Sequence, residues 1–220
     1  MTITIREPGS ALTHFFGMVL AIFASTPLLI KAALDAGQTG FIAAAVFIAS
    51  MILLYGASTL YHSVNLSGKK LKIFRKIDHM MIFVLIAGSY TPVCLMVLQP
   101  RSGYRLLAIV WGIAAVGILI KSLWITCPKW FSSVFYIAMG WACLSVFDEL
   151  LVSLPRPAFL WLLAGGILYT VGGIIYALKL PLFNLKHRNF GSHEIFHVFV
   201  MLGSACHFIV MYFFVAPMPI

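Results

Sequence analysis

Long apolar stretches separated by short polar connections make up almost the whole chain. Each stretch has roughly the 20 predominantly apolar residues that a helix needs to cross the hydrocarbon core of a bilayer. The stretches are residues 11–34, 41–63, 77–98, 104–123, 130–151, 158–180 and 192–215. In lipid the backbone polar groups must be paired within the chain, which only helices and closed barrels achieve. The sequence lacks the alternation of strands and turns that a barrel requires. The pattern therefore predicts seven transmembrane helices.

Composition favours a membrane protein and leaves little room for anything else. Of the 220 residues, 62% are hydrophobic and only 10% are charged, and the mean hydropathy is +1.02. A soluble domain has about 25% charged residues, so this much apolar surface needs lipid around it. Because the connections are short, we expect an all-α integral membrane protein in which residues 1–220 form one transmembrane domain.

Lysine and arginine residues predict the orientation of the helices, since they accumulate on the cytoplasmic side. With a cytoplasmic N-terminus, eleven of them lie inside and four outside. The inner set is Arg6, Lys69, Lys70, Lys72, Arg75, Lys76, Lys121, Lys129, Lys179, Lys186 and Arg188, and the outer set is Lys31, Arg101, Arg105 and Arg156. We therefore expect the N-terminus inside and the C-terminus outside, in the cell inner (plasma) membrane, with the first helix as an uncleaved signal anchor.

The longest basic connection, residues 64–76, is expected to be a loop that contacts anionic lipid headgroups. On this interpretation, the net charge of +9 reflects the basic residues that set the orientation of the helices in the membrane. The basic residues lie in short connections against the membrane. Binding of nucleic acid is therefore the weaker interpretation, and the expected partner is the lipid bilayer.

A metal-binding pattern begins the last apolar stretch. His193 and His197 are four residues apart, so on a helix they lie on one face, about 6 Å apart along the axis. The same segment reads H-E-x-x-H, the zinc-protease signature in which the glutamate is the base. Glu194, however, follows Ser192, a good N-cap, and a carboxylate in the first turn favours the helix dipole. We interpret Glu194 as a helix-start residue, because the chain offers no soluble domain to form a protease cleft.

Topology places three further polar residues near this pair of histidines. In the predicted orientation, His62 and Asp78 approach the cytoplasmic face at the depth of His193 and His197, and Ser58 lies one turn deeper than His62. Three neutral imidazoles leave one position of a tetrahedral zinc ion open, as in catalytic sites. Asp78 is then the candidate base or water-orienting group, and Ser58 a candidate hydrogen-bond donor.

A structural interpretation of the same residues stays open. His62 and Asp78 can reach interfacial water, while the two C-terminal histidines cap polar loops. His14, near the start of the first stretch, either supports the site or packs in the core. His207 lies about 15 Å beyond His197 along the helix, which is too deep to bind the same ion.

In these residues the chain resembles the hemolysin III family, the bacterial branch of the progestin and adipoQ receptors, in a superfamily that includes alkaline ceramidases. The similarity covers the whole chain and rests on four segments in order: Leu12-Thr-His14, Ser58-x-x-x-His62, Asp78-His79 and His193-x-x-x-His197. It implies a zinc ion held by His62, His193 and His197. It also implies that Ser58 and Asp78 lie close to the ion, with Asp78 touching a water. The chain lacks the long N-terminal region of the animal receptors, so their ligand binding and signalling are not expected here.

Three functions are compatible with such a site. The first is zinc-dependent hydrolysis of a lipid amide within the membrane, in which apolar helix walls hold a fatty-acyl chain. The second is a non-enzymatic sensor or regulator of membrane state, with zinc as a structural link between helices. The third, a pore-forming cytolysin, follows from the family's name alone. It is the weakest, because the sequence has no secretion signal and no polar stripe to line a channel.

Overall fold

The computed structural model describes residues 5–178 and 190–218, and among these residues there is no strand. The elements are α1 (Pro8–Ser63), α2 (Gly68–Pro92), the π-helix η1 (Val93–Val97), α3 (Pro100–Leu123), α4 (Lys129–Gly140), the 3₁₀ helix η2 (Trp141–Val146), α5 (Phe147–Ser153), α6 (Arg156–Leu178), α7 (Ser192–Val210) and the π-helix η3 (Met211–Val215). Within these two described ranges, six helical spans are long and apolar enough to cross a membrane. The prediction of an all-α membrane protein is thus confirmed. The predicted end of the sixth stretch and the basic residues Lys179, Lys186 and Arg188 lie outside the described residues.

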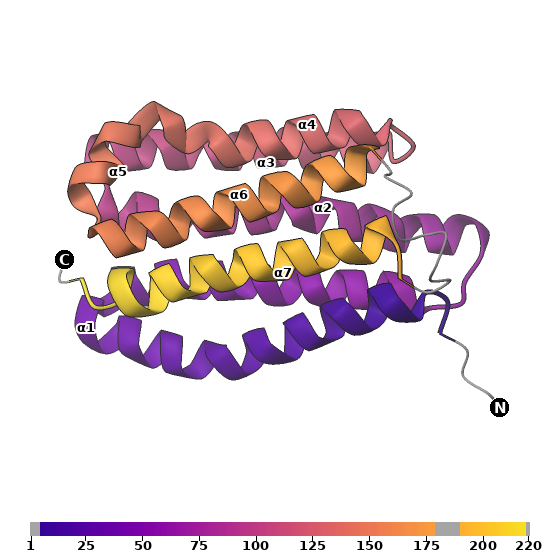
Figure 1. Ribbon diagram of the computed structural model, residues 1–220, viewed down its shortest axis with the longest axis horizontal. Helices are drawn as coiled ribbons and strands as arrows, with labels where there is room; N and C mark the ends of the chain where they lie inside the picture. Colours follow the sequence, from indigo (N-terminus) through magenta and orange to yellow (C-terminus); the bar gives the residue numbers. More distant parts are fainter. Residues whose placement is uncertain (1–4, 179–189, 219–220) are drawn as a thin grey trace.

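The first two predicted stretches lie in the single element α1, which breaks at Gly37. The backbone of Gly37 has φ 60° and ψ −151°, a conformation that glycine adopts without steric cost. The chain reverses at this break, and the two parts of α1 run back along each other (Figure 1). A Cβ atom at Gly17 would lie 3.2 Å from the Tyr55 ring, so the two parts of α1 pack closely at this glycine. The reversal brings the beginning and the end of α1 together.

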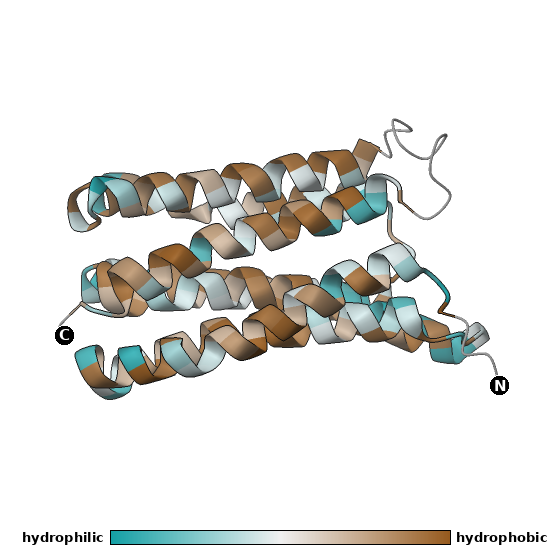
Figure 2. Ribbon diagram, turned by 60° about the horizontal axis from the view of Figure 1, so that its bottom comes forward, coloured by the Kyte–Doolittle hydropathy of each residue, from teal (hydrophilic) through white to brown (hydrophobic). Residues whose placement is uncertain are grey.

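The helices lie side by side in one bundle whose outer surface is apolar. Hydrophobic residues cover the middle of the helices, and polar residues collect at the two ends of the bundle (Figure 2). Phe23, Leu34 and Val152 have 75%, 80% and 88% of their surface exposed. Exposed apolar side chains in such number are stable in lipid and unstable in water, because a soluble monomer rarely exposes large contiguous apolar patches. The bilayer is therefore the environment of the bundle.

The expected loop at residues 64–76 was wrong, because helix α2 begins at Gly68 and contains most of the basic residues of this segment. Lysine and arginine are good helix formers, so a basic segment next to an apolar helix extends it readily. The helix begins after Ser67, and Gly68 has a φ of 60°. The basic residues therefore extend beyond the apolar part of α2 as helical turns.

The predicted helix at 130–151 is interrupted in the middle. The hydroxyl of Tyr90 donates to the carbonyl oxygen of Gly140 at 2.5 Å and accepts the backbone N–H of Cys143 at 3.0 Å. Both backbone groups would otherwise pair within an α-helix, so the phenol of α2 replaces helical hydrogen bonds between α4 and η2. A side chain inserted into the hydrogen-bond ladder is a known cause of such a break.

Close packing of α3 against η1 depends on Gly103. A Cβ atom at this position would lie 2.1 Å from the carbonyl oxygen of Cys94, a backbone atom that has little freedom to move. We expect Gly103→Ala to destabilise the protein by about 1–3 kcal/mol. Thermal unfolding in detergent should show a midpoint lower by several degrees. Gly112→Ala on the same helix is the matched control, since no atom lies within 4 Å of its added Cβ. Equal midpoints for the two variants would contradict the role of Gly103.

Candidate metal centre

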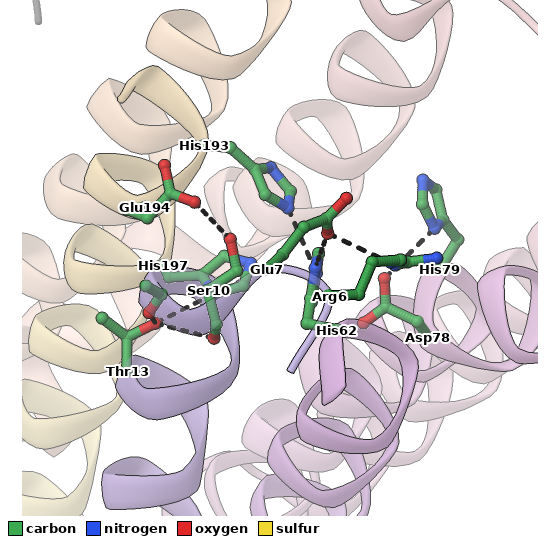
Figure 3. A network of polar contacts seen from close by, with 11 residues as sticks. Arg6, Glu7, Ser10, Thr13, His62, Asp78, His79, His193, Glu194 and His197 are labelled. Carbon is green, nitrogen blue, oxygen red and sulfur yellow. Dashed lines mark hydrogen bonds and ion pairs between the residues drawn. The ribbon is translucent and has the colours of Figure 1, made fainter. Parts of the chain in front are cut away.

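Three histidines from α1 and α7 meet at one end of the bundle. His62 is in the last turn of α1, and His193 and His197 are in the first two turns of α7 (Figure 3). One ring nitrogen of each lies within 4.8 Å of the others. His62 and His197 are only 1% and 2% exposed. The reversal of α1 at Gly37 is what places His62 beside the start of α7.

Hydrogen bonds orient two of the three imidazoles. His62 Nδ1 bonds the carboxylate of Glu7, and His197 Nδ1 lies 3.2 Å from the carbonyl oxygen of Ser10 and 3.2 Å from Thr13 Oγ1. A carbonyl oxygen and a carboxylate accept hydrogen bonds, so each Nδ1 carries the hydrogen and each Nε2 keeps a lone pair in the neutral ring. Histidines that bind metals are oriented by this kind of contact at the second nitrogen.

The distances and the chemistry of the donors fit a metal ion. Nε2 of His62 lies 3.2 Å from Nε2 of His193. A tetrahedral ion with bonds of about 2.05 Å holds two nitrogen ligands about 3.3 Å apart. Imidazole nitrogens suit zinc and its neighbours in the transition series. The residues His62, His193 and His197 therefore fit an ion of this class.

His14 completes the packing around the cluster. Its ring stacks on the His197 ring with a centroid distance of 3.7 Å and an interplanar angle of 7°. It also contacts Tyr55 across the two parts of α1, at 5.1 Å between ring centroids. Within the described chain, both ring nitrogens of His14 are buried without a hydrogen-bond partner. His14 thus packs against the His197 ring, and its two ring nitrogens remain free to form hydrogen bonds.

Asp78 and Ser58 lie on the wall of the same cavity as His193 and His197. Asp78 is 7% exposed, and its carboxylate lies 3.3 Å from Nδ1 of the neighbouring His79. Ser58 is 1% exposed, and its hydroxyl has no hydrogen-bond partner among residues 5–178 and 190–218. Of the described residues that line this cavity, Asp78 is the only one with a carboxylate. Among the described residues, the cavity therefore offers a single acidic group and two unpaired hydroxyls, those of Ser58 and Ser133.

The cavity extends from this polar end into the apolar interior of the bundle. It has about 170 Å³ of space open to water, roughly ten times the ~15 Å³ that one water needs. Its walls come mainly from α2, α4, α6 and α7, and at the far end they include Phe147, Leu150 and Phe159. The lining is largely apolar away from the histidines. A long, narrow apolar molecule with a polar end matches this distribution.

Sequence reasoning missed Glu7, Ser10 and Thr13. Glu7 precedes α1, and its backbone N–H donates to the carbonyl oxygen of His62 at 3.0 Å. Its hydrogen bond with the His62 ring is the main reason that the pKa of the Glu7 carboxyl lies below its ordinary value, although partial burial acts in the opposite direction. The predicted topology could have pointed to them, because all three residues lie at the same predicted depth, near the cytoplasmic face, as His62.

Glu194 faces away from the histidine cluster. One carboxylate oxygen accepts the backbone N–H of the N-cap residue Gly191 at 2.7 Å, which is the half of a capping box that the N3 side chain supplies. The other accepts the hydroxyl of Ser10 at 2.5 Å and so ties α7 to α1. Glu194 thus has the helix-start role expected from the sequence, but the expectation of Ser192 as the N-cap was wrong, because Gly191 is the N-cap and Ser192 is the first residue of α7. The protease interpretation of H-E-x-x-H has no support, since both oxygens of Glu194 are engaged elsewhere.

Comparison with known proteins agrees with these features. The family model described as "Haemolysin-III related" matches residues 3–208. The chain is 39% identical over 213 residues to "Hemolysin-3" of Bacillus cereus, covering 96% of this chain and 93% of that protein. It is 39% identical over 218 residues to the "Hemolysin-3 homolog" of Bacillus subtilis (strain 168), covering 98% of each.

A more distant similarity reaches an animal protein. The "Adiponectin receptor protein" of Drosophila melanogaster is 24% identical over 225 residues, which cover 92% of this chain and 49% of that protein. The chain thus spans about half the length of this relative. The resemblance expected from the four sequence segments is confirmed, and the chain belongs to the haemolysin-III-related family.

Proposed function

We propose that this protein is a zinc-dependent hydrolase of a lipid amide, acting within the cell inner membrane. The observation that carries the proposal is a cluster of three histidines, two of which share the wall of a largely apolar cavity with the carboxylate of Asp78. Soluble substrates have no need of a cavity lined by membrane helices. A lipid does, because its chain is already in the hydrocarbon layer and only its polar group must reach the reactive residues.

In this proposal His62, His193 and His197 hold the zinc ion, and Glu7, Ser10 and Thr13 keep two of the rings in place. Bound zinc would polarise the amide carbonyl and lower the pKa of a water to about 7. Asp78 would accept the proton of the attacking water, being the one carboxylate on the described cavity wall. The unpaired hydroxyl of Ser58 would donate a hydrogen bond to the developing oxyanion.

The proposal includes a topology of seven spans with the N-terminus in the cytoplasm. The two parts of α1 on either side of Gly37 would each cross the membrane, and the five remaining long apolar spans would cross once each. This orientation is supported by the lysine and arginine residues, since most of them are predicted at the end of the bundle where the histidines lie. The site would then open toward the cytoplasmic surface.

Hydrolysis is tested with purified protein in lipid nanodiscs, loaded with zinc. We expect it to release free fatty acid from at least one class of N-acyl lipid, such as N-acyl sphingoid bases, N-acyl ethanolamines or N-acyl amino acids. Mass spectrometry measures the released acid over time, and His197→Ala is the inactive control. A zinc-loaded wild-type protein that releases no acid from the whole panel would contradict the proposal.

One observation favours a second candidate, a sensor or regulator in which zinc is structural. The histidine cluster joins the last turn of α1 to the start of α7, and the bond of Ser10 with Glu194 links the first turn of α1 to α7. In that case the histidine variants would lose thermal stability while the wild type shows no turnover. A cytolytic pore, suggested by the names of the Bacillus relatives, would instead release dye from liposomes that contain the protein.

A further inference from the structure

An ionisable side chain lies deep in the membrane part of the cavity, far from the histidine cluster. His207 follows His197 by ten residues on α7, which places it about 15 Å further along the helix axis. It is 8% exposed, and it lines the cavity. Ionisable residues inside membrane helices are costly and are usually retained for function. The proposed hydrolysis gives His207 no role.

The hydrogen bonding of His207 decides which kind of atom it presents. Its Nδ1 lies 2.8 Å from the carbonyl oxygen of Gly203, one turn earlier on α7. A carbonyl oxygen only accepts, so Nδ1 carries the hydrogen, and Nε2 of the neutral ring is a hydrogen-bond acceptor. No residue of the described chain bonds to Nε2. The His207 ring therefore offers the cavity an acceptor and no second donor.

Close packing holds the ring in this orientation. Gly165 on α6 faces it, and a Cβ atom there would lie 2.5 Å from His207 Nδ1. The ring of Tyr169 packs on the same side, with 5.2 Å between the ring centroids. Rotation of the ring toward α6 is blocked, so the position of Nε2 is well defined. A fixed acceptor is what a specific hydrogen bond requires.

Several hydroxyls near His207 bond to other groups of the protein. The hydroxyls of Tyr169 and Ser204 lie 2.8 Å apart. Thr170 donates to the carbonyl oxygen of Gly166 at 2.7 Å and accepts the indole N–H of Trp141 at 2.9 Å. The bond between Tyr169 and Ser204 uses one of their two O–H hydrogens, and the buried hydroxyl of Tyr55 has no hydrogen-bond partner in the described chain. None of these bonds involves His207 Nε2, which keeps its lone pair.

We propose that His207 determines specificity by accepting a hydrogen bond from a hydroxyl in the middle of a long lipid chain. A buried water is usually held by two to four polar partners. A hydroxyl carried by the chain needs only one. The inference rests on the proposed function for the position of the lipid, whose polar end would lie at the histidine cluster. The ligand class is a long-chain lipid with a mid-chain hydroxyl.

Two fatty acids test this directly, because oleic acid and ricinoleic acid differ only in a mid-chain hydroxyl. Zinc-loaded protein in nanodiscs is titrated with each acid, and displacement of a fluorescent fatty acid gives the two dissociation constants. We expect ricinoleic acid to bind about tenfold more tightly, the effect of one net hydrogen bond. His207→Leu should reduce the ratio to about one and leave the affinity for oleic acid within about threefold. His207→Gln should keep part of the preference, since its amide oxygen can accept.

Equal affinities for the two acids in the wild type would overturn the proposal, as would a preference that survives in His207→Leu, or failure of both acids to bind. General destabilisation changes both affinities alike and leaves their ratio unmoved. The outcome is separate from catalysis. A protein with the preference that releases no acid from amide lipids contradicts the hydrolase alone, whereas a hydrolase without the preference contradicts only the role of His207.

Discussion

Replacing His197 with alanine is expected to lower the zinc content of the purified protein from one ion per chain to nearly none. His197 is buried, and hydrogen bonds from its Nδ1 side leave Nε2 for the ion. Removing it leaves two imidazoles, and two ligands do not complete a stable zinc site. His62→Ala and His193→Ala should give the same result. Elemental analysis by mass spectrometry, normalised to protein concentration, measures the ratio.

His207→Leu is the matched control for zinc content. His207 is also a buried histidine of α7, but it does not belong to the cluster. We expect this variant to keep its zinc, which would separate loss of a ligand from loss of any buried histidine. His197→Gln preserves more of the side-chain volume and should lose the ion as well. Wild-type protein without metal after loading, or variants of the cluster with full zinc, would refute the metal site.

Changing Asp78 to asparagine is expected to reduce turnover by at least about a hundredfold while the zinc content stays at one. Asparagine keeps the shape of the side chain but has no basic oxygen for the proton of the attacking water. No second carboxylate on the described cavity wall can replace it. Initial rates of fatty-acid release from the best amide lipid and zinc content of the same preparation are measured together.

Asp35→Asn is the control for the loss of a carboxylate. Asp35 is exposed near Gly37 and pairs with Lys31 at 3.9 Å, far along α1 from the histidines. Its variant should retain the wild-type rate. Unchanged turnover in Asp78→Asn would exclude Asp78 as the base. If Asp78→Asn lost both its zinc and its turnover, Asp78 would instead be needed to bind the ion.

Much of the fold was predictable because the bilayer imposes a simple rule on the sequence. A run of about 20 apolar residues has to be a helix across the membrane, and basic flanks set which end is inside. Depth along the membrane normal follows from these two facts. This is why Asp78 and the three histidines were expected in one layer. The spacing of His193 and His197 needed only helical geometry.

The interruption by Tyr90 shows what depth alone does not predict. The apolar pattern of 130–151 is that of one helix, yet a hydroxyl from α2 takes over hydrogen bonds between Gly140 and Cys143. That contact depends on which helices are neighbours and on how each is rotated about its axis. Neither quantity leaves a periodic signal in the chain, because lipid-facing and core-facing residues are both apolar.

The sequence by itself determined the helices, the family and the residue types that meet at the proposed cytoplasmic end. Only the tertiary structure decided how those residues are connected. The contact of Glu7 with His62, the pairing of Glu194 with Ser10 and the free Nε2 of His207 all come from contacts between residues far apart along the chain or from the space left between helices. A linear pattern sets depth, whereas hydrogen bonds and cavities depend on lateral packing in three dimensions.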